Sequence, residues 1–303
     1  MNTVVITGAT SFIGKNVLKE LLKQDYFVYA VVRNPQKIAE FKESQNLRII
    51  ACDLNQIEEL PQKIDDKIDI FYHLAWDGTR ASARADVEKQ NINLLQSIVV
   101  MNVAKMLGCH TFIGAGSQAE YGQCEGIITE EYPAMPMTEY GKAKLAVYQK
   151  GCDLLPKAGI KFIWTRIFSV YGVGDYEGTL VSTAINKMLK NEPMKLTECT
   201  QTWDFVHVSD VARAFVKLIG APAGVYNVAN GDYRMLRDFV MRIKDLTQSQ
   251  SELLFGAIPY GATGKVSFQP DASKLKNTVN WKPIVDFDEG IKEIIQEQRK
   301  AND

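Results

Sequence analysis

The alternation of short apolar segments with helix-length stretches is the feature that most constrains how this chain can fold. The first segment, TVVITG at 3–8, is short, apolar and ends in glycine, as a buried strand does. The other such segments lie at 27–32, 47–53, 68–75, 110–117 and 161–172. Strands that are apolar on both faces and separated by helices favour a parallel sheet with helices on both sides. Because such crossovers are right-handed, we predict an α/β fold with a doubly wound parallel sheet.

Composition and charge exclude several classes of partner. The chain has 303 residues and a formal net charge of -1, so there is no electrostatic case for nucleic acid or an anionic membrane. Its five cysteines are widely spaced and odd in number, which fits free thiols in a reducing cytosol. It has only three histidines and no cysteine pair at ligand spacing, so we expect no metal site. We find no signal-peptide pattern and no apolar run that could span a bilayer, and we expect a cytoplasmic protein.

The loop after the first strand, VITGATSFIG, has the arrangement of a dinucleotide-binding turn. In doubly wound sheets, ligands bind where strands end and helix N-termini present free N–H groups to an anion. Gly8 permits a tight turn, and Gly14 lets the following helix pack closely against the sheet. Ser11 stands where a third glycine is expected, and we expect its hydroxyl and backbone N–H to face a phosphate. An ordinary turn before a helix is the alternative.

The end of the second strand predicts which dinucleotide binds. An acidic side chain there binds the ribose hydroxyls of NAD, whereas arginine suits the 2′-phosphate of NADP. This chain has Arg33 and Lys37 at that point and no carboxylate, which favours NADP(H), with NAD(H) still possible. The alternative is that both cations are merely solvated. Asp53 ends the third strand, where it would contact the adenine or cap the segment that starts at Leu54.

Three residues form a candidate catalytic set. Tyr140 and Lys144 are four residues apart, which places them on one face of a helix. A nearby ammonium lowers the pKa of a tyrosine, so the pair can donate and accept a proton, and Lys144 could also hold the cofactor ribose. Ser117 ends the fifth strand, where its hydroxyl can bind a substrate oxygen. Each also has an ordinary interpretation as a turn serine, a half-buried aromatic or an exposed lysine. Their order after a phosphate loop favours the site.

Beyond Gly172 the regular alternation stops. Later residues carry shorter, mixed elements with more turns, apart from a strand-like and helix-like stretch over 205–228. We therefore predict an NAD(P)-binding Rossmann domain over 1–172, to which 205–228 returns. Residues 173–303 would form a smaller, mainly substrate-binding part.

Taken together, the motifs TGATSFIG, HLA, GSQAEYG, YGKAK, RIFSVYG, WDFVHVSDVARA and GVYNVANG resemble the extended short-chain dehydrogenase/reductases. More narrowly, they are similar to the NAD(P)-dependent epimerase/dehydratase group that acts on nucleotide sugars. The resemblance covers nearly the whole chain and implies that Ser117 binds the substrate, Tyr140 is the acid/base and Lys144 activates it. The cofactor-binding residues that we expect are Gly8, Thr10, Ser11, Phe12, Ile13, Gly14, Arg33, Lys37, Asp53, Leu54, Leu74, Ala75, Trp76, Tyr140, Lys144 and Phe168.

Departures from the family pattern narrow the expected activity. Gln118 and Ala119 stand where the family's 4,6-dehydratases usually carry an acid pair, so elimination of water lacks its carboxylates. Ser169 and Trp203 replace an asparagine and an arginine that are usual near the nucleotide sugar. The substrate-binding residues that we expect are Trp76, Arg80, Gln118, Ser169 and Trp203. Arg80 and Arg84 would either contact the substrate diphosphate or stay solvated.

Epimerisation and reduction remain as the chemistries that the resemblance implies. Within the family, C4 epimerases usually bind NAD through an acidic end of the second strand, which this chain lacks. We therefore expect an NADPH-dependent reductase of a 4-keto (deoxy)sugar nucleotide. The alternatives are a nucleotide-sugar C4 epimerase and a non-catalytic protein that binds or senses NADP. The family also implies a homodimer, formed through the helix of Tyr140 and the helix over 90–107.

Overall fold

The computed structural model describes residues 2–261 and 263–302. A parallel sheet of seven strands forms its centre, in the order β12-β7-β5-β4-β1-β2-β3. The order changes direction at β1, which creates the switch point where doubly wound sheets bind ligands. The predicted fold class is confirmed. The strands are β1 (Thr3–Thr7), β2 (Phe27–Val32), β3 (Leu47–Ala51), β4 (Ile70–His73), β5 (Thr111–Ser117), β7 (Lys161–Ile167) and β12 (Gly224–Val228).

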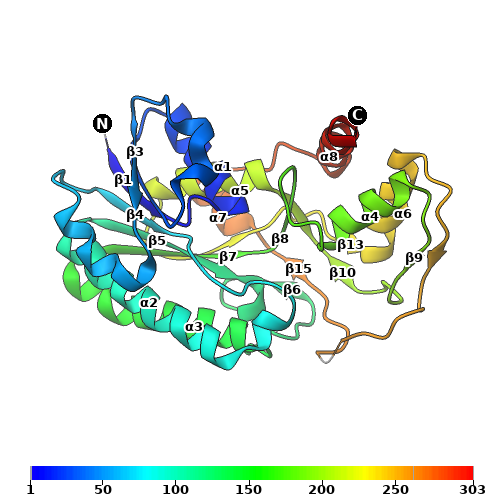
Figure 1. Cartoon of the computed structure of the whole chain (residues 1–303). Coiled ribbons are helices and arrows are strands. Elements are labelled where there is room, and N and C mark those ends of the chain that lie inside the picture. The colour runs from blue at the N-terminus through cyan, green and yellow to red at the C-terminus, as the bar shows by residue number, and fades with distance from the viewer. Residues whose placement is uncertain (1, 262, 303) are drawn as a thin grey trace.

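Helices cover both faces of this sheet (Figure 1). Alternation along β1 explains the two layers, because Val4 and Ile6 join the core with one pair of helices while Val5 joins the core with the other. Both faces of every central strand are therefore buried, as the apolar runs predicted. The first layer is α1 (Phe12–Lys23) and α5 (Val208–Lys217), and the second is α2 (Val87–Met106) and α3 (Glu139–Leu154).

The segment 161–172 is two strands instead of the single strand that its pattern predicts. The backbone N–H of Phe168 still donates to Val228 O in the edge strand, but the chain then leaves the main sheet. Beyond that residue β8 (Ser169–Tyr171) pairs in parallel with β11 (Phe205–His207). This pairing directs the chain into the C-terminal part and places Ser169 away from the sheet edge.

The C-terminal part has its own apolar core, in which Tyr171, Phe239 and Phe287 pack together. Three helices surround it: α4 (Leu180–Leu189), α6 (Leu236–Thr247) and α8 (Phe287–Asn302). Figure 1 shows these helices beyond the edge of the sheet. The short helix α7 (Ser273–Val279) precedes α8 in the chain and packs against the edge strand β12. The segment 205–228 contributes both α5 and β12 to the layered part. The division of the chain at residue 172 stays a prediction.

Short elements complete the structure. No helix in the described part of the chain combines the length and apolarity that crossing a membrane requires. The short strands are β6 (Ile127–Ile128), β9 (Met194–Lys195), β10 (Thr202–Trp203), β13 (Arg234–Met235), β14 (Leu253–Leu254) and β15 (Gln269–Pro270). The 3₁₀ helices are η1 (Pro35–Phe41), η2 (Leu54–Gln62), η3 (Ala81–Ala85), η4 (Gln118–Glu120), η5 (Pro156–Ala158) and η6 (Leu218–Gly220).

Candidate active site

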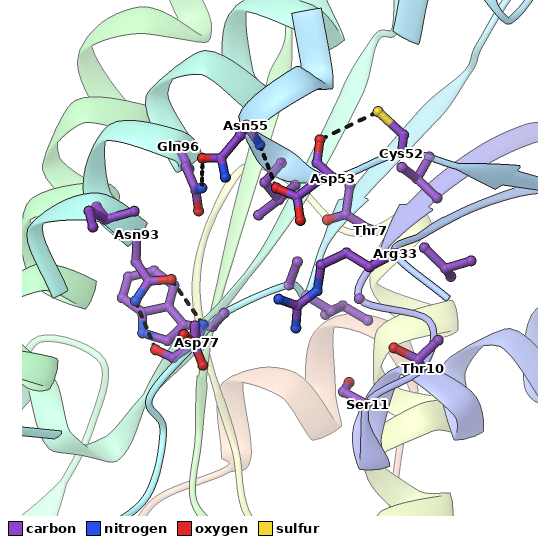
Figure 2. Close-up of a pocket in the computed structure, with 18 of the residues that line it drawn as sticks. Thr7, Thr10, Ser11, Arg33, Cys52, Asp53, Asn55, Asp77, Asn93 and Gln96 are labelled. Carbon is purple, nitrogen blue, oxygen red and sulfur yellow. Dashed lines mark hydrogen bonds between the residues drawn. The ribbon is translucent and has the colours of Figure 1, made fainter. Parts of the chain in front are cut away.

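A cleft of about 580 Å³ lies where β1, β2, β3 and β4 end (Figure 2). Its position at the switch point is the position that the fold predicts for a dinucleotide. The expected cofactor residues that line it are Gly8, Thr10, Ser11, Arg33, Asp53, Leu54, Leu74, Ala75 and Trp76.

The glycine loop has the close backbone approach that its sequence predicts. Gly8 has a φ of +80°, and a Cβ on it would lie 2.5 Å from Ala75 N. A Cβ on Gly14 would lie 2.0 Å from Gly8 O, so only glycine lets α1 begin this close to β1. Ser11 caps α1, and its hydroxyl accepts the Gly14 N–H at 3.0 Å. The expectation for the Ser11 backbone N–H is wrong, because it donates to Gly8 O at 2.9 Å to close the turn.

The two cations after β2 have different positions. Figure 2 shows Arg33 pointing into the cleft, where its charge helps to lower the pKa of Asp77 after the larger effect of Lys89. Lys37 is exposed on η1 and does not line this cleft or the cavity described below. Asp53 caps the segment that starts at Leu54, and its contact with an adenine stays a prediction. It lines the cleft, and its side chain accepts the Asn55 N–H at 2.9 Å to cap η2.

Sequence reasoning missed the polar wall opposite the glycine loop. Gln96 on α2 donates to Asn55 Oδ1 at 2.8 Å, and Asn93 accepts the Asp77 N–H at 2.9 Å (Figure 2). The helix over 90–107 is predicted to form a dimer contact, which its apolar content fits, and no role is predicted for its polar residues. The usable signal was that Asn93 and Gln96 are three residues apart and share one face of that helix.

A second cavity, of about 470 Å³, lies between the sheet and the C-terminal part. Trp76 lines both this cavity and the cofactor cleft, so the two spaces meet at its side chain. Strands β8 and β11 and helix α4 supply the wall opposite α3. The predicted residues that line this cavity are Ser11, Phe12, Ile13, Leu74, Trp76, Arg80, Ser117, Gln118, Tyr140, Lys144, Phe168, Ser169 and Trp203.

The structure brings Ser117, Tyr140 and Lys144 together at this cavity, and all three are buried. Ser117 ends β5, whereas Tyr140 and Lys144 lie one turn apart on α3. Burial raises the pKa of Tyr140, while the Arg84 guanidinium and a hydrogen bond from Ser117 lower it. Arg84 stacks 4.3 Å from the centre of the Tyr140 ring, and Lys144 Nζ lies 5.8 Å from it, so an arginine outside the Tyr–Lys motif adds a second cation beside the phenol.

Lys144 is held by a backbone oxygen of β5 and by the ring of Trp76, in the loop after β4. Its Nζ donates to Ala115 O at 2.7 Å and lies 3.5 Å from the centre of the Trp76 ring. Burial lowers the pKa of Lys144 to about 7, and the negative charge of Glu120 acts in the opposite direction. The indole of Trp76 is itself fixed, because its Nε1 donates to Gln90 Oε1 at 2.9 Å. Lys144 can therefore exchange a proton near neutral pH.

The expected substrate residues have specific contacts. Arg80 lies 3.6 Å from Asp175 Oδ1 and stacks on the Tyr176 ring, so it spans the cavity between the two parts of the chain. Gln118 Nε2 donates to Ser169 Oγ at 3.3 Å. Within the described residues, Gln118 Oε1 is buried without a hydrogen-bond partner. It is therefore suited to accept a hydrogen bond from a hydroxyl group of a ligand.

A glycine-rich turn at the switch point and a Ser–Tyr–Lys set beside it define a dinucleotide-dependent enzyme of the extended short-chain dehydrogenase/reductase type. Residues 4–229 match the model of the NAD dependent epimerase/dehydratase family, and the chain belongs to that family.

Individual relatives are distant in sequence but cover the whole chain. The CDP-abequose synthase of Salmonella typhimurium is 25% identical in an alignment 304 positions long, which covers 97% of each protein. The UDP-glucose 4-epimerase of Thermotoga maritima, solved with UDP-glucose, has a TM-score of 0.89 at 23% identity and covers 99% of this chain and 100% of its own. The UDP-glucose 4-epimerase of Thermus thermophilus, solved with NAD, has a TM-score of 0.86 at 22% identity, with 99% of both chains covered. The two structures show a shared fold.

Proposed function

We propose that the protein is an NADPH-dependent reductase of a 4-keto (deoxy)sugar nucleotide. The observation that carries the proposal is the convergence of Ser117, Tyr140 and Lys144 in a cavity that meets the cofactor cleft at Trp76. A carbonyl bound beside Tyr140 would there have a proton donor and face the cleft in which a dinucleotide fits.

The residues of the cleft fit a dinucleotide. Glycines at 8 and 14 let β1, the loop after β4 and the start of α1 pack closely, and Ser11 at the N-terminus of α1 lines the cleft, where the positive end of the helix dipole suits a pyrophosphate. When bound, the reduced nicotinamide supplies the hydride for reduction. Arg33 is the reason to propose NADP(H), because it points into the cleft directly after β2 and can pair with a 2′-phosphate. The description of the family as NAD dependent keeps NAD(H) as the alternative cofactor.

The chain's own residues supply the proton chemistry of the reduction. The Ser117 hydroxyl donates a hydrogen bond to the substrate carbonyl and orients it toward Tyr140. The Tyr140 hydroxyl gives its proton to the carbonyl oxygen as charge develops there. Lys144 and Arg84 then stabilise the phenolate that Tyr140 has become. The buried position of Tyr140 and Lys144 excludes water and strengthens these charge interactions.

A C4 epimerase is the second candidate function. The structural similarity to UDP-glucose 4-epimerases favours it, and an epimerase would use the same three side chains. A non-catalytic NADP-binding protein is less favoured, since all three side chains are intact and converge on one cavity. The test is to incubate the protein with NADPH and a panel of 4-keto sugar nucleotides, and in parallel with NAD⁺ or NADP⁺ and a panel of 4-hydroxy sugar nucleotides. Stoichiometric loss of NADPH with a keto substrate supports the reductase. Interconversion of two hydroxy sugars without net loss of cofactor contradicts it.

We also infer that the protein is a homodimer, as the family resemblance implies, and that it is cytoplasmic, where its free cysteines stay reduced. Large apolar side chains of α2 that lie exposed on the single chain support a contact there, and these are Val87, Ile92, Leu95 and Met106. Light scattering during gel filtration tests the dimer, and a monomeric mass at micromolar concentration contradicts it.

A further inference from the structure

A fully buried carboxylate lies directly behind the catalytic side chains. Glu120 ends η4, the short 3₁₀ helix that follows β5. Its Oε1 accepts the Ser117 N–H at 2.8 Å and Trp164 Nε1 at 3.0 Å, and its Oε2 accepts Arg166 Nε at 3.0 Å. Burial raises the pKa of Glu120, but every one of these partners donates a hydrogen. The ionised carboxylate is therefore the form that fits the site.

The surrounding sequence is built around this carboxylate. Trp164 and Arg166 are two residues apart on β7, so their side chains lie on the same face of the sheet. Between them and η4 lies Gly116 of β5. A Cβ there would be 2.3 Å from Trp164 Nε1 and 2.4 Å from Glu120 Oε1. The glycine therefore makes room for the contact of Glu120 with β7.

Glu120 and Lys144 bind backbone groups that lie two residues apart at the end of β5. Glu120 binds the backbone N–H of Ser117, and Lys144 binds Ala115 O at 2.7 Å. The carboxylate also acts through its charge: it raises the pKa of Lys144 against the effect of burial, and it raises the pKa of Tyr140. The cavity faces Ser117 from one side, while Glu120 holds its backbone from within the protein.

We propose that Glu120 is a positioning residue of this site, which fixes the backbone of Ser117 and places a buried negative charge behind the side chains of Ser117, Tyr140 and Lys144. The inference rests on the proposed function, since it assigns Glu120 a part in the reaction of Ser117, Tyr140 and Lys144. The alternative is a purely structural ion pair between Glu120 and Arg166, which would leave the titration of the catalytic groups unchanged.

Other titratable groups also face the site, and of these Arg80 and Asp175 line the cavity and pair with each other. Among the described residues, Arg84 of η3 acts on Tyr140 with a positive charge, and Lys144 itself lies on the same helix. His73 of β4 is neutral, because burial lowers its pKa to about 3, with a smaller contribution from Lys144. Glu120 is thus the negative charge that acts on both Lys144 and Tyr140.

The direct test is an NMR titration of Lys144, which needs neither cofactor nor substrate. Lysines are labelled with ¹³C at Cε, and the Lys144 signal is assigned with the variant Lys144→Met. In Glu120→Gln, the loss of the negative charge should lower the pKa of Lys144 by on the order of one unit. Glu130→Gln is the matched control. It removes a half-buried carboxylate that binds the Asn227 N–H and has no contact with Ser117, so it should leave the titration in place.

A second variant keeps the test decisive if Glu120→Gln folds poorly. Glu120→Gln leaves the Arg166 guanidinium buried and unpaired, whereas Glu120→Gln/Arg166→Met removes both charges together. The same downward shift of Lys144 in either folded variant supports the proposal. An unchanged Lys144 titration in a folded variant overturns it and leaves Glu120 as part of a structural ion pair.

Kinetics distinguish this inference from the proposed function. If the reductase is correct, the alkaline limb of the kcat profile should move to lower pH in Glu120→Gln by the same shift as the NMR titration, while Glu130→Gln keeps the original profile. If no keto sugar is reduced but Lys144 still shifts, the proposed function fails while the coupling of Glu120 to Lys144 stands. A shift of Lys144 with an unmoved kcat limb overturns the role of Glu120 in the reaction.

Discussion

At the scale of single residues, the sequence predicted which candidate catalytic side chains share one cavity better than it predicted what surrounds them. Ser117, Tyr140 and Lys144 were identifiable because strand ends and helical spacing are local patterns, and the structure brings them together. The stacking of Arg84 on Tyr140 and of Trp76 on Lys144 was not predictable. Those contacts depend on how the segment around η3 folds over α3, which no local pattern encodes.

Replacement of Tyr140 by Phe should remove the proton donor and lower turnover by about 10²–10⁴-fold. Binding of NADPH should persist, because the cofactor cleft is lined mainly by other residues. Tyr148→Phe is the matched control, since Tyr148 lies two turns further along α3 and packs on Phe162. Rates of NADPH oxidation and fluorescence titration of NADPH measure the two effects. Full turnover by Tyr140→Phe would remove Tyr140 from the mechanism.

Reversal of the charge at Arg33 should change the cofactor preference. Arg33→Glu should weaken NADPH binding by at least about tenfold and favour NADH, because a charge-assisted hydrogen bond contributes roughly 1.5–3 kcal/mol. Lys37→Glu makes the same charge change on η1, outside the cleft, and should leave the preference unchanged. Dissociation constants for both cofactors check the prediction. Equal effects of the two variants would mean that Arg33 does not contact the 2′-phosphate.

The pH dependence of turnover should follow Lys144. Burial lowers the pKa of Lys144 to about 7, so its positive charge is present below that pH and is lost as the pH rises through it. The phenolate of Tyr140 then loses a stabilising cation, and kcat should fall. Lys144→Arg stays charged, so a slower enzyme without this decline is expected. A wild-type kcat that stays constant from about pH 6 to about pH 9 would contradict the role of Lys144.

At the scale of elements, the strands of the central sheet follow from their apolar runs, whereas the break at Phe168 does not. The stretch 161–172 is mainly apolar and has no turn signal at Phe168, and it divides because β8 pairs with β11, far along the chain. Short-range pattern cannot reveal a pairing that tertiary structure selects. The same holds for η4, whose capping box of Ser117 and Glu120 is readable only once the end of β5 is known.

Gly116 on β5 gives a prediction about stability. Gly116→Ala should destabilise the fold by about 1–3 kcal/mol, because its Cβ would collide with Trp164 and Glu120. Gly220→Ala is the matched control, since a Cβ there meets nothing within 4 Å. Urea unfolding of both variants measures the difference. Equal stability of the two variants would show that the side chains of Trp164 and Glu120 can shift to admit the methyl group at little cost in free energy.

At the scale of the whole molecule, the cofactor cleft and the catalytic cavity are built from segments far apart in sequence. Arg80 reaches Asp175 across the cavity, and Trp76 lies where the two spaces meet. The doubly wound fold and its ligand-binding edge were predictable because alternation and crossover handedness leave few topologies. The wall of the cavity that β8, β11 and α4 form was not predictable, because these elements are brought together by pairing between segments that are distant in sequence.

Isotope transfer tests the proposed reduction most directly. The protein is mixed with NADPH that carries deuterium on the transferred position of the nicotinamide, together with a 4-keto sugar nucleotide. The reductase proposal predicts a 4-hydroxy product with one deuterium at C4 and one NADP⁺ formed for each product molecule. A product of the keto sugar without deuterium at C4 would contradict it. In a parallel mixture of a 4-hydroxy sugar nucleotide with NAD⁺ or NADP⁺, interconversion of two epimers without net change of the cofactor would contradict it and establish an epimerase.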